Sequence, residues 1–122
     1  MINGFNYVAI PVYDLPAMAV WYRDTLALEI TEQTRSAVEF RLGASATLAL
    51  YPGGAASTKA APEHEEYYVC LEVDALGPLL ERLKQQGRRP EHGIEPKGDG
   101  RLADIRDPEG HLLGLWEKRR SS

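Results

Sequence analysis

Three carboxylates and two tyrosines stand in segments of this sequence that have the alternating pattern of β-strands. Glu39, Glu72 and Asp104 each occupy a polar position between apolar ones, and Tyr7 and Tyr68 begin two of these segments. A carboxylate can act as a general base, and a neutral phenol can donate a hydrogen bond to an oxygen that gains negative charge. Together these residues indicate a site for proton transfer or for binding a polar organic molecule.

Two arginines could form ion pairs with the carboxylates and so keep them from acting on a substrate. Arg41 and Arg106 follow Glu39 and Asp104 by two positions, so each points to the same face of its strand as the acid before it. Carboxylates on such a face more often pair with neighbouring cations than act on a substrate. The sequence therefore predicts ion pairs from these arginines to the acids, with a reactive carboxylate as the alternative.

The other residues that could hold a metal or act as a nucleophile are placed unfavourably. His64, His92 and His111 fall in loop-like segments, where we expect solvated side chains rather than ligands. The single Cys70 excludes an internal disulfide and a multi-cysteine zinc or iron–sulfur site. We expect Cys70 to be a small residue on the same strand face as Glu72 rather than a nucleophile.

Composition and charge restrict the class of protein. A chain of 122 residues with 43% hydrophobic and 26% charged residues is typical of one globular domain, residues 1–122. Its net charge of −4 disfavours a nucleic acid as partner, and no apolar run reaches the roughly 20 residues that span a bilayer. The first residues lack the basic and apolar pattern of a signal segment, so we expect a cytoplasmic protein.

The spacing of apolar residues predicts the same order of elements twice. In the first half we expect a strand at 7–12, a helix at 15–27 capped by Asp14, and strands at 29–34, 37–42 and 46–51. In the second half we expect a strand at 68–73, a helix between the cap Asp74 and Gly87, and strands at 89–96, 101–106 and 111–117. Residues 52–64 have no periodicity and are interpreted as a linker between a first module, 5–51, and a second module, 66–117.

The two halves also repeat in their residues. Tyr7-Val-Ala-Ile-Pro-Val matches Tyr68-Val-Cys-Leu-Glu-Val, 61 positions later, and each is followed by an aspartate and a helix. Thr47-Leu-Ala-Leu-Tyr matches Leu112-Leu-Gly-Leu-Trp, 65 positions later. Because both matches occur in the same order, a duplicated unit is the better interpretation.

Three segments carry a resemblance to a known family: Val-Ala-Ile-Pro-Val-Tyr-Asp-Leu at 8–15, Trp-Tyr-Arg-Asp-Thr-Leu at 21–26 and Arg-Asp-Pro-Glu-Gly-His at 106–111. They resemble the vicinal oxygen chelate superfamily, which includes glyoxalase I, bleomycin-resistance proteins and extradiol dioxygenases. The resemblance covers nearly the whole chain. It implies an α+β fold in which two β-α-β-β-β modules form a curled mixed sheet around a groove, with the helices on the outer face. It also implies a homodimer.

The alternation of side chains assigns a face to each strand residue. Val8, Ile10 and Val12 belong under a helix, so Tyr7 faces the groove. The same argument, applied strand by strand, gives the remaining candidates for ligand binding: Arg41, Ala49, Tyr51, Tyr68, Glu72, Asp104, Gly114 and Trp116.

The positions that would hold the family's metal lack its usual ligands. In metal-dependent members, four groove positions carry His or Glu, and the resemblance places them at Tyr7, Ala49, Tyr68 and Gly114. Alanine and glycine have no side-chain donor, and a neutral phenol is a poor ligand for a divalent ion near neutral pH. The sequence therefore predicts no metal and no other cofactor.

The leading functional interpretation is a metal-independent protein, similar to the bleomycin-resistance branch, that sequesters an organic ligand or drug in an aromatic-lined groove. The alternative is a metal-independent lyase, isomerase or hydrolase in which Glu72, Asp104 or Glu39 is the general base. A third interpretation is an interaction module whose groove another protein closes. The sequence identifies neither the ligand nor a reaction, and it allows the modules to pair within one chain or across a dimer.

Overall fold

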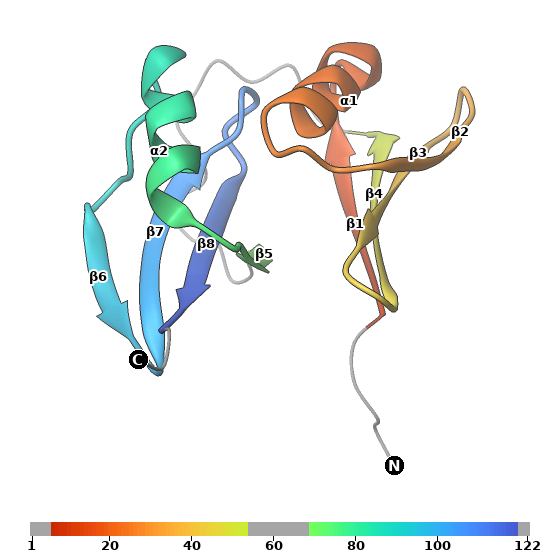
Figure 1. The fold of residues 1–122 in the computed structure, drawn as a ribbon. Helices are drawn as coiled ribbons and strands as arrows, with labels where there is room; N and C mark the ends of the chain where they lie inside the picture. The colour runs from red at the N-terminus through yellow and green to blue at the C-terminus, as the bar shows by residue number, and fades with distance from the viewer. Residues whose placement is uncertain (1–5, 54–68, 120–122) are drawn as a thin grey trace. The chain divides into compact units, whose positions relative to one another are not determined.

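The computed structural model describes residues 6–53 and 69–119, which belong to two compact units, Met1–Thr58 and Lys59–Ser122 (Figure 1). The described part of each unit has one helix and four strands in the order β-α-β-β-β, which confirms the predicted repeat. The described strands form two mixed four-stranded sheets, so the fold is α+β as predicted. In these two ranges, no helix is both long enough and apolar enough to span a membrane.

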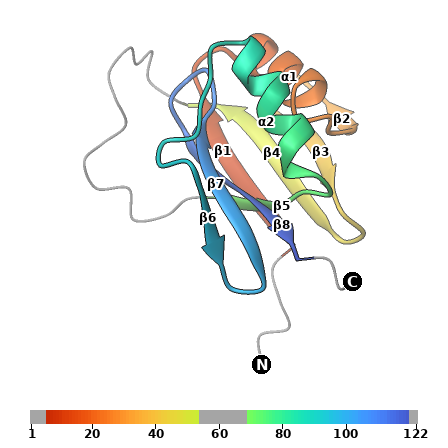
Figure 2. The same cartoon turned by 60° about the vertical axis from the view of Figure 1, so that its left-hand side comes forward.

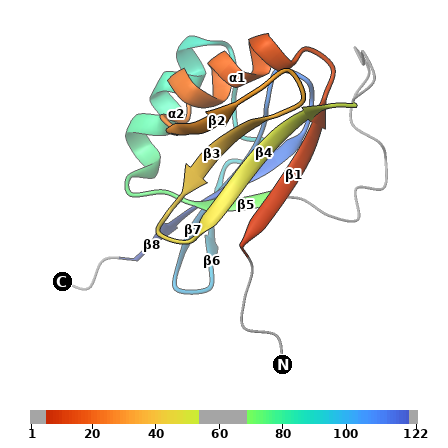
Figure 3. The ribbon, with the colours of Figure 1, turned by 90° about the vertical axis from the view of Figure 1, so that its right-hand side faces the viewer.

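The first unit consists of β1 (Tyr7–Val12), α1 (Leu15–Asp24), β2 (Ile30–Gln33), β3 (Val38–Leu42) and β4 (Ala46–Pro52). Its strand order is β1-β4-β3-β2, with β1 parallel to β4 and the other pairs antiparallel (Figure 3). Asp14 caps α1 as predicted, because its Oδ1 accepts a hydrogen bond from the Ala17 amide at 3.1 Å. The helix ends at Asp24 rather than at residue 27, since Ala27 adopts the left-handed conformation with φ +59°.

The second unit consists of β5 (Val69–Glu72), α2 (Leu76–Gln85), β6 (Ile94–Lys97), β7 (Gly100–Arg106) and β8 (Leu112–Lys118). Its strand order, β5-β8-β7-β6, repeats that of the first unit (Figure 2). The strand expected at 89–96 is shorter and later, because Gly93 has φ +75° and interrupts any extended run before Ile94.

The helix cap predicted at Asp74 is wrong. The N-cap residue of α2 is Ala75, whose methyl side chain cannot accept a hydrogen bond. Instead, Oε1 of Glu117, which comes from β8, accepts from the Leu76 amide at 2.6 Å. The carboxylate that compensates the helix N-terminus therefore comes from a distant strand, which local sequence patterns do not reveal.

One face of each sheet is buried against its helix. In the first unit this core contains Ile10, Val12, Val38, Phe40, Leu48 and Leu50, with Met18, Ala19, Trp21 and Tyr22 from α1. In the second unit it contains Leu71, Ala103, Ile105, Leu113 and Leu115, with Leu76 and Leu83 from α2. The strand residues in these two sets are ones that the alternation placed under the helices, so their neighbours along each strand point to the opposite, helix-free face.

Candidate functional site

The helix-free face of the first unit brings together Tyr7, Ala49 and Glu39. Ala49 on β4 lies between Ala9 on β1 and Glu39 on β3, and each of these pairs is in direct register. Ala49 is 1% exposed, so its small side chain is covered in the structure. The face therefore has a row with little side-chain bulk, and the carboxylate of Glu39 stands at one end of it.

Tyr7 reaches across this row. Its hydroxyl donates a hydrogen bond to Oε2 of Glu39, with an oxygen–oxygen distance of 3.3 Å. Partial desolvation raises the pKa of the Tyr7 phenol, and the charge of Glu39 and the hydrogen bond to it raise that pKa further. The phenol is therefore a protonated donor at neutral pH. Sequence reasoning missed this contact, because it depends on the register of three strands.

Arg41 does not neutralise Glu39. Its Nε lies 3.3 Å from Oε1 of Glu29, and both side chains are more than half exposed. The predicted ion pair from Arg41 to a carboxylate of this face is therefore wrong. Register gives the reason, since Arg41 lies opposite Thr47, one row away from Glu39, and its backbone amide also bonds the carbonyl of Glu29.

The helix-free face of the second unit repeats this arrangement. Gly114 on β8 lies between Cys70 on β5 and Asp104 on β7, again in direct register. In both units an acid thus stands directly across from the residue that lacks a donor: Glu39 beside Ala49, and Asp104 beside Gly114. Directly opposed residues of neighbouring strands lie about 5 Å apart, so each acid is an immediate neighbour of the residue that lacks a donor.

Asp104 differs from Glu39 in its hydrogen bonding. Its Oδ1 is buried and accepts no hydrogen bond from any described residue. The predicted pairing with Arg106 is wrong, because Nε of Arg106 lies 2.7 Å from Oε1 of Glu91 and its Nη1 donates to the carbonyl of Gly110 at 2.8 Å. Arg106 lies opposite Leu112, one row beyond Asp104, and is directed toward the β7–β8 turn.

The aromatic candidates lie farther along the same faces. Trp116 stands between Glu72 and Leu102 in the next row of the second sheet, and its indole Nε1 donates to the carbonyl of Lys97 at 2.9 Å. This bond fixes a half-buried ring against the β6–β7 turn. Tyr51 is 39% exposed and pairs with Pro11. Glu72 is exposed, and Tyr68 lies outside the described residues.

His111 contradicts the expectation of a solvated loop side chain. Its Nδ1 lies 2.8 Å from Oδ2 of Asp107, whose side chain is fully buried. Oδ1 of Asp107 also accepts from the amides of Glu109 and His111 at 3.0 and 2.9 Å. An aspartate that opens an Asp-Pro-Glu-Gly turn is the signal for such bonds, because its side chain bonds amides two to four residues later. His92 is exposed as expected, and His64 is outside the described residues.

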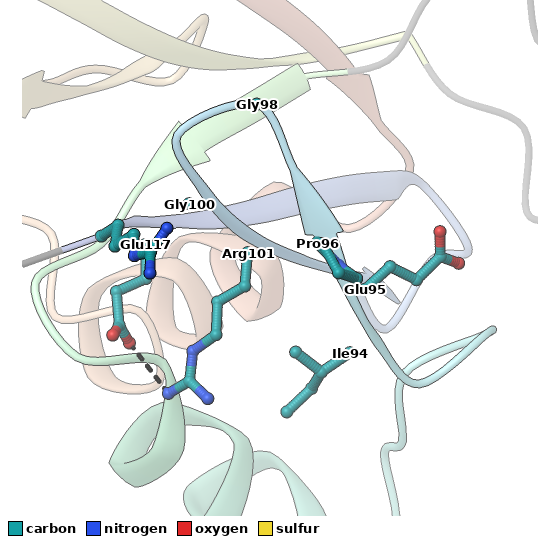
Figure 4. A pocket seen from close by; sticks show the side chains of 8 residues that line it. Ile94, Glu95, Pro96, Gly98, Gly100, Arg101 and Glu117 are labelled. Atoms are coloured by element: carbon teal, nitrogen blue, oxygen red, sulfur yellow. Dashed lines mark hydrogen bonds and ion pairs between the residues drawn. The ribbon is translucent and has the colours of Figure 1, made fainter.

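A separate hollow lies on the helix-covered side of the second sheet. It has a volume of about 620 Å³, and Ile94, Pro96, Arg101 and Glu117 are among the residues that line it (Figure 4). Arg101 and Glu117 form an ion pair of 3.2 Å within it. Among the described residues, none of the ligand-binding candidates predicted from the sequence lines this hollow. It is therefore distinct from the helix-free face that carries Asp104.

The described residues do not fit the family's metal. Of the four positions that would supply ligands, Ala49 and Gly114 have no donor atom, and the hydroxyl of Tyr7 is bonded to Glu39. Among residues 6–53 and 69–119, no three His, Cys, Asp or Glu side chains are grouped so that they could hold an ion. The groups that the described residues offer on these faces include carboxylates, a phenol and aromatic rings.

Comparison with known proteins identifies the superfamily that the sequence motifs resemble. The family model of the glyoxalase/bleomycin resistance protein/dioxygenase superfamily matches residues 4–115. An ethylmalonyl-CoA/methylmalonyl-CoA epimerase of Cereibacter sphaeroides is 32% identical over 108 residues, covering 80% of this chain and 81% of the epimerase.

Two solved structures have the same fold at lower identity. Lactoylglutathione lyase from Agrobacterium tumefaciens has a TM-score of 0.71 and 22% identity, over 95% of this chain and 94% of that one. The fosfomycin resistance protein FosX from Listeria monocytogenes has a TM-score of 0.71 and 20% identity, over 96% and 94% of the two chains.

Proposed function

Because the chain belongs to the glyoxalase/bleomycin resistance protein/dioxygenase superfamily, we propose that it binds a small organic molecule on its helix-free sheet faces without the family's metal. The observation that carries this proposal is where the groups that could bind a ligand lie on those faces. The metal positions Ala49 and Gly114 have no donor, whereas carboxylates stand directly across from both of them. Such a face suits hydrogen bonding to an organic ligand better than ion coordination.

The aromatic residues support the same function. Tyr7 is 49% exposed and Tyr51 39% exposed on the first sheet, and Trp116 is half-buried on the second. Solvent-accessible aromatic rings beside a few polar groups are typical of sites for partly apolar molecules. Sequestration of a drug-like compound, as in the bleomycin-resistance branch, is the form of this function that we propose.

Thermal-shift screening of the full chain against aromatic and peptide antibiotics tests the proposal. A ligand present at 100 times its Kd stabilises the native state by about 2.7 kcal/mol, which raises Tm by several degrees in a protein of this size. We expect at least one compound to produce such a shift at millimolar concentration. The absence of any shift across the set would contradict small-molecule binding.

Proton-transfer catalysis is a second candidate, favoured by the unpartnered Oδ1 of Asp104 and by the similarity to an epimerase. In such a reaction Asp104 would take a proton from a carbon beside a carbonyl, exchange it with solvent and return a solvent-derived proton to the same carbon. Glu39 is less suited to this role, because its Oε2 already accepts a hydrogen bond from Tyr7.

Deuterium incorporation from D₂O into ethylmalonyl-CoA measures this activity. We expect incorporation with the wild type and its loss in Asp104→Asn. Incorporation no faster than in buffer alone would exclude the enzyme for this substrate class.

We also propose that the protein acts as a cytoplasmic homodimer, as the family resemblance implies. Light scattering should then give twice the chain mass of 13.6 kDa. The mass of a single chain at micromolar concentration would contradict the dimer.

A further inference from the structure

Asp104 has an oxygen that lacks a partner. Its Oδ1 is buried and accepts no hydrogen bond from the described part of the chain, while the nearby Arg106 is engaged by Glu91 and Gly110. Buried carboxylate oxygens are costly without hydrogen-bond donors, and each such atom in a native protein needs a structural or functional explanation. A donor from outside the described chain would resolve the cost.

Part of the Asp104 side chain is exposed, although Oδ1 itself is buried. Asp104 as a whole is half-buried, and its direct neighbour Gly114 has no side chain. Beyond Gly114 lies Cys70, which is exposed. In the adjacent row, the ring of Trp116 is held by its bond to Lys97. An incoming molecule would therefore meet a carboxylate and an aromatic ring on the same face.

The local charge favours a cation. Glu72 lies exposed in the row next to Asp104 and adds a second negative charge to this face. Partial desolvation is the largest cause that raises the pKa of the Cys70 thiol. The negative charge of Asp104 raises this pKa further, while the positive charge of Lys97 lowers it more weakly. The field that Cys70 experiences is therefore dominated by the carboxylate rather than by the lysine.

We propose that Asp104 is the anchoring acid of the ligand site and that it binds the cationic N–H group of a flat aromatic amine or amidine. The inference rests on the small-molecule binding proposed above and names the ligand class. Hydrogen bonds between a cation and a carboxylate are about twice as strong as neutral ones, so a charged ligand should bind at least about tenfold more tightly than its neutral isostere. The ring of Trp116 provides an apolar surface for the aromatic part.

Cys70 is the reporter for the experiment, because it is the single cysteine of the chain and lies on the same row as Asp104. The rate of its alkylation by iodoacetamide is followed by intact mass in the presence of benzamidine, benzamide or benzoate. These three probes share a flat shape and carry positive, zero and negative charge. We expect benzamidine to protect Cys70 at a concentration at least about tenfold below that of benzamide, and benzoate not to protect it.

Two variants distinguish an effect of the Asp104 carboxylate from an effect of the protein's net charge. Asp104→Asn keeps the side-chain shape, and we expect it to abolish the preference for benzamidine and to speed alkylation of the free protein by lowering the pKa of Cys70. Glu81→Gln removes one negative charge from an exposed position on α2 and should keep the preference. Comparison of the three probes on the wild type tests the proposal even if Asp104→Asn does not fold.

The outcomes distinguish this inference from the proposed function. Equal protection by benzamidine and benzamide, or an unchanged preference in Asp104→Asn, would show that Asp104 is not the anchor. Failure of all three probes would overturn the cationic ligand class. In each of these cases a thermal shift with a neutral compound would leave small-molecule binding intact.

Discussion

Replacement of Asp107 by alanine is expected to lower the free energy of unfolding by about 3 kcal/mol or more. The buried carboxylate accepts hydrogen bonds from the amides of Glu109 and His111 and contacts Nδ1 of His111. Its removal leaves these donors without their acceptor inside a turn, and each lost or unsatisfied bond costs on the order of 1 kcal/mol or more. Urea denaturation followed by tryptophan fluorescence and circular dichroism measures the change.

Asp107→Asn is the matched control for this prediction. Its amide keeps one carbonyl oxygen for a backbone donor, so we expect roughly half of the loss. The turn connects β7 to β8, which carry Asp104 and Gly114, so the alanine variant should also weaken the protection of Cys70 by benzamidine. A loss of stability below about 1 kcal/mol would show that the carboxylate does not hold the turn.

Replacement of Phe40 by alanine is expected to cost about 3–5 kcal/mol of stability. Phe40 is 0% exposed on the helix-covered face of β3, and its ring centroid lies 6.1 Å from that of Tyr22 on α1. Truncation removes a large apolar side chain and leaves a cavity that the sheet can fill only in part. The same denaturation experiment provides the measurement.

Two neighbouring variants test the assignment of faces. Phe40→Leu keeps most of the volume and should cost less than about 1.5 kcal/mol. Glu39→Gln changes the adjacent residue on the helix-free face and should also cost little, about 1 kcal/mol or less, because it alters a single hydrogen bond. A larger loss from Glu39→Gln than from Phe40→Ala would mean that the two faces of β3 are reversed.

The sequence was sufficient for the fold and for the helix-covered faces of the described strands. A period of two in Val8, Ile10 and Val12, and again in Ala103 and Ile105, required one apolar face against a helix, and the structure buries those faces. Asp14 was identified as a helix cap because its bond is local, to an amide three residues later. Asp74 was not a cap, because Glu117 supplies the carboxylate from a strand that lies far along the chain.

The candidate site was predictable only in part, for the same reason. Alternation placed Glu39, Asp104 and Tyr7 on the helix-free faces, but which side chains meet there depends on register between strands. Spacing along one strand favoured pairing of Arg41 and Arg106 with the nearest acids. In the structure, both arginines reach instead to Glu29 and Glu91, which approach from neighbouring segments. The bond between Tyr7 and Glu39 likewise needed the three-strand register.

We infer that this member of the superfamily acts through carboxylates and aromatic rings, since its metal positions include Ala49 and Gly114. Elemental analysis of the purified chain, produced in medium supplemented with zinc, nickel, manganese and iron, tests it most directly. We predict far less than one equivalent of any of these ions per chain after gel filtration. One equivalent of a tightly held divalent ion would mean that the protein has a metal site and does not act through these side chains alone.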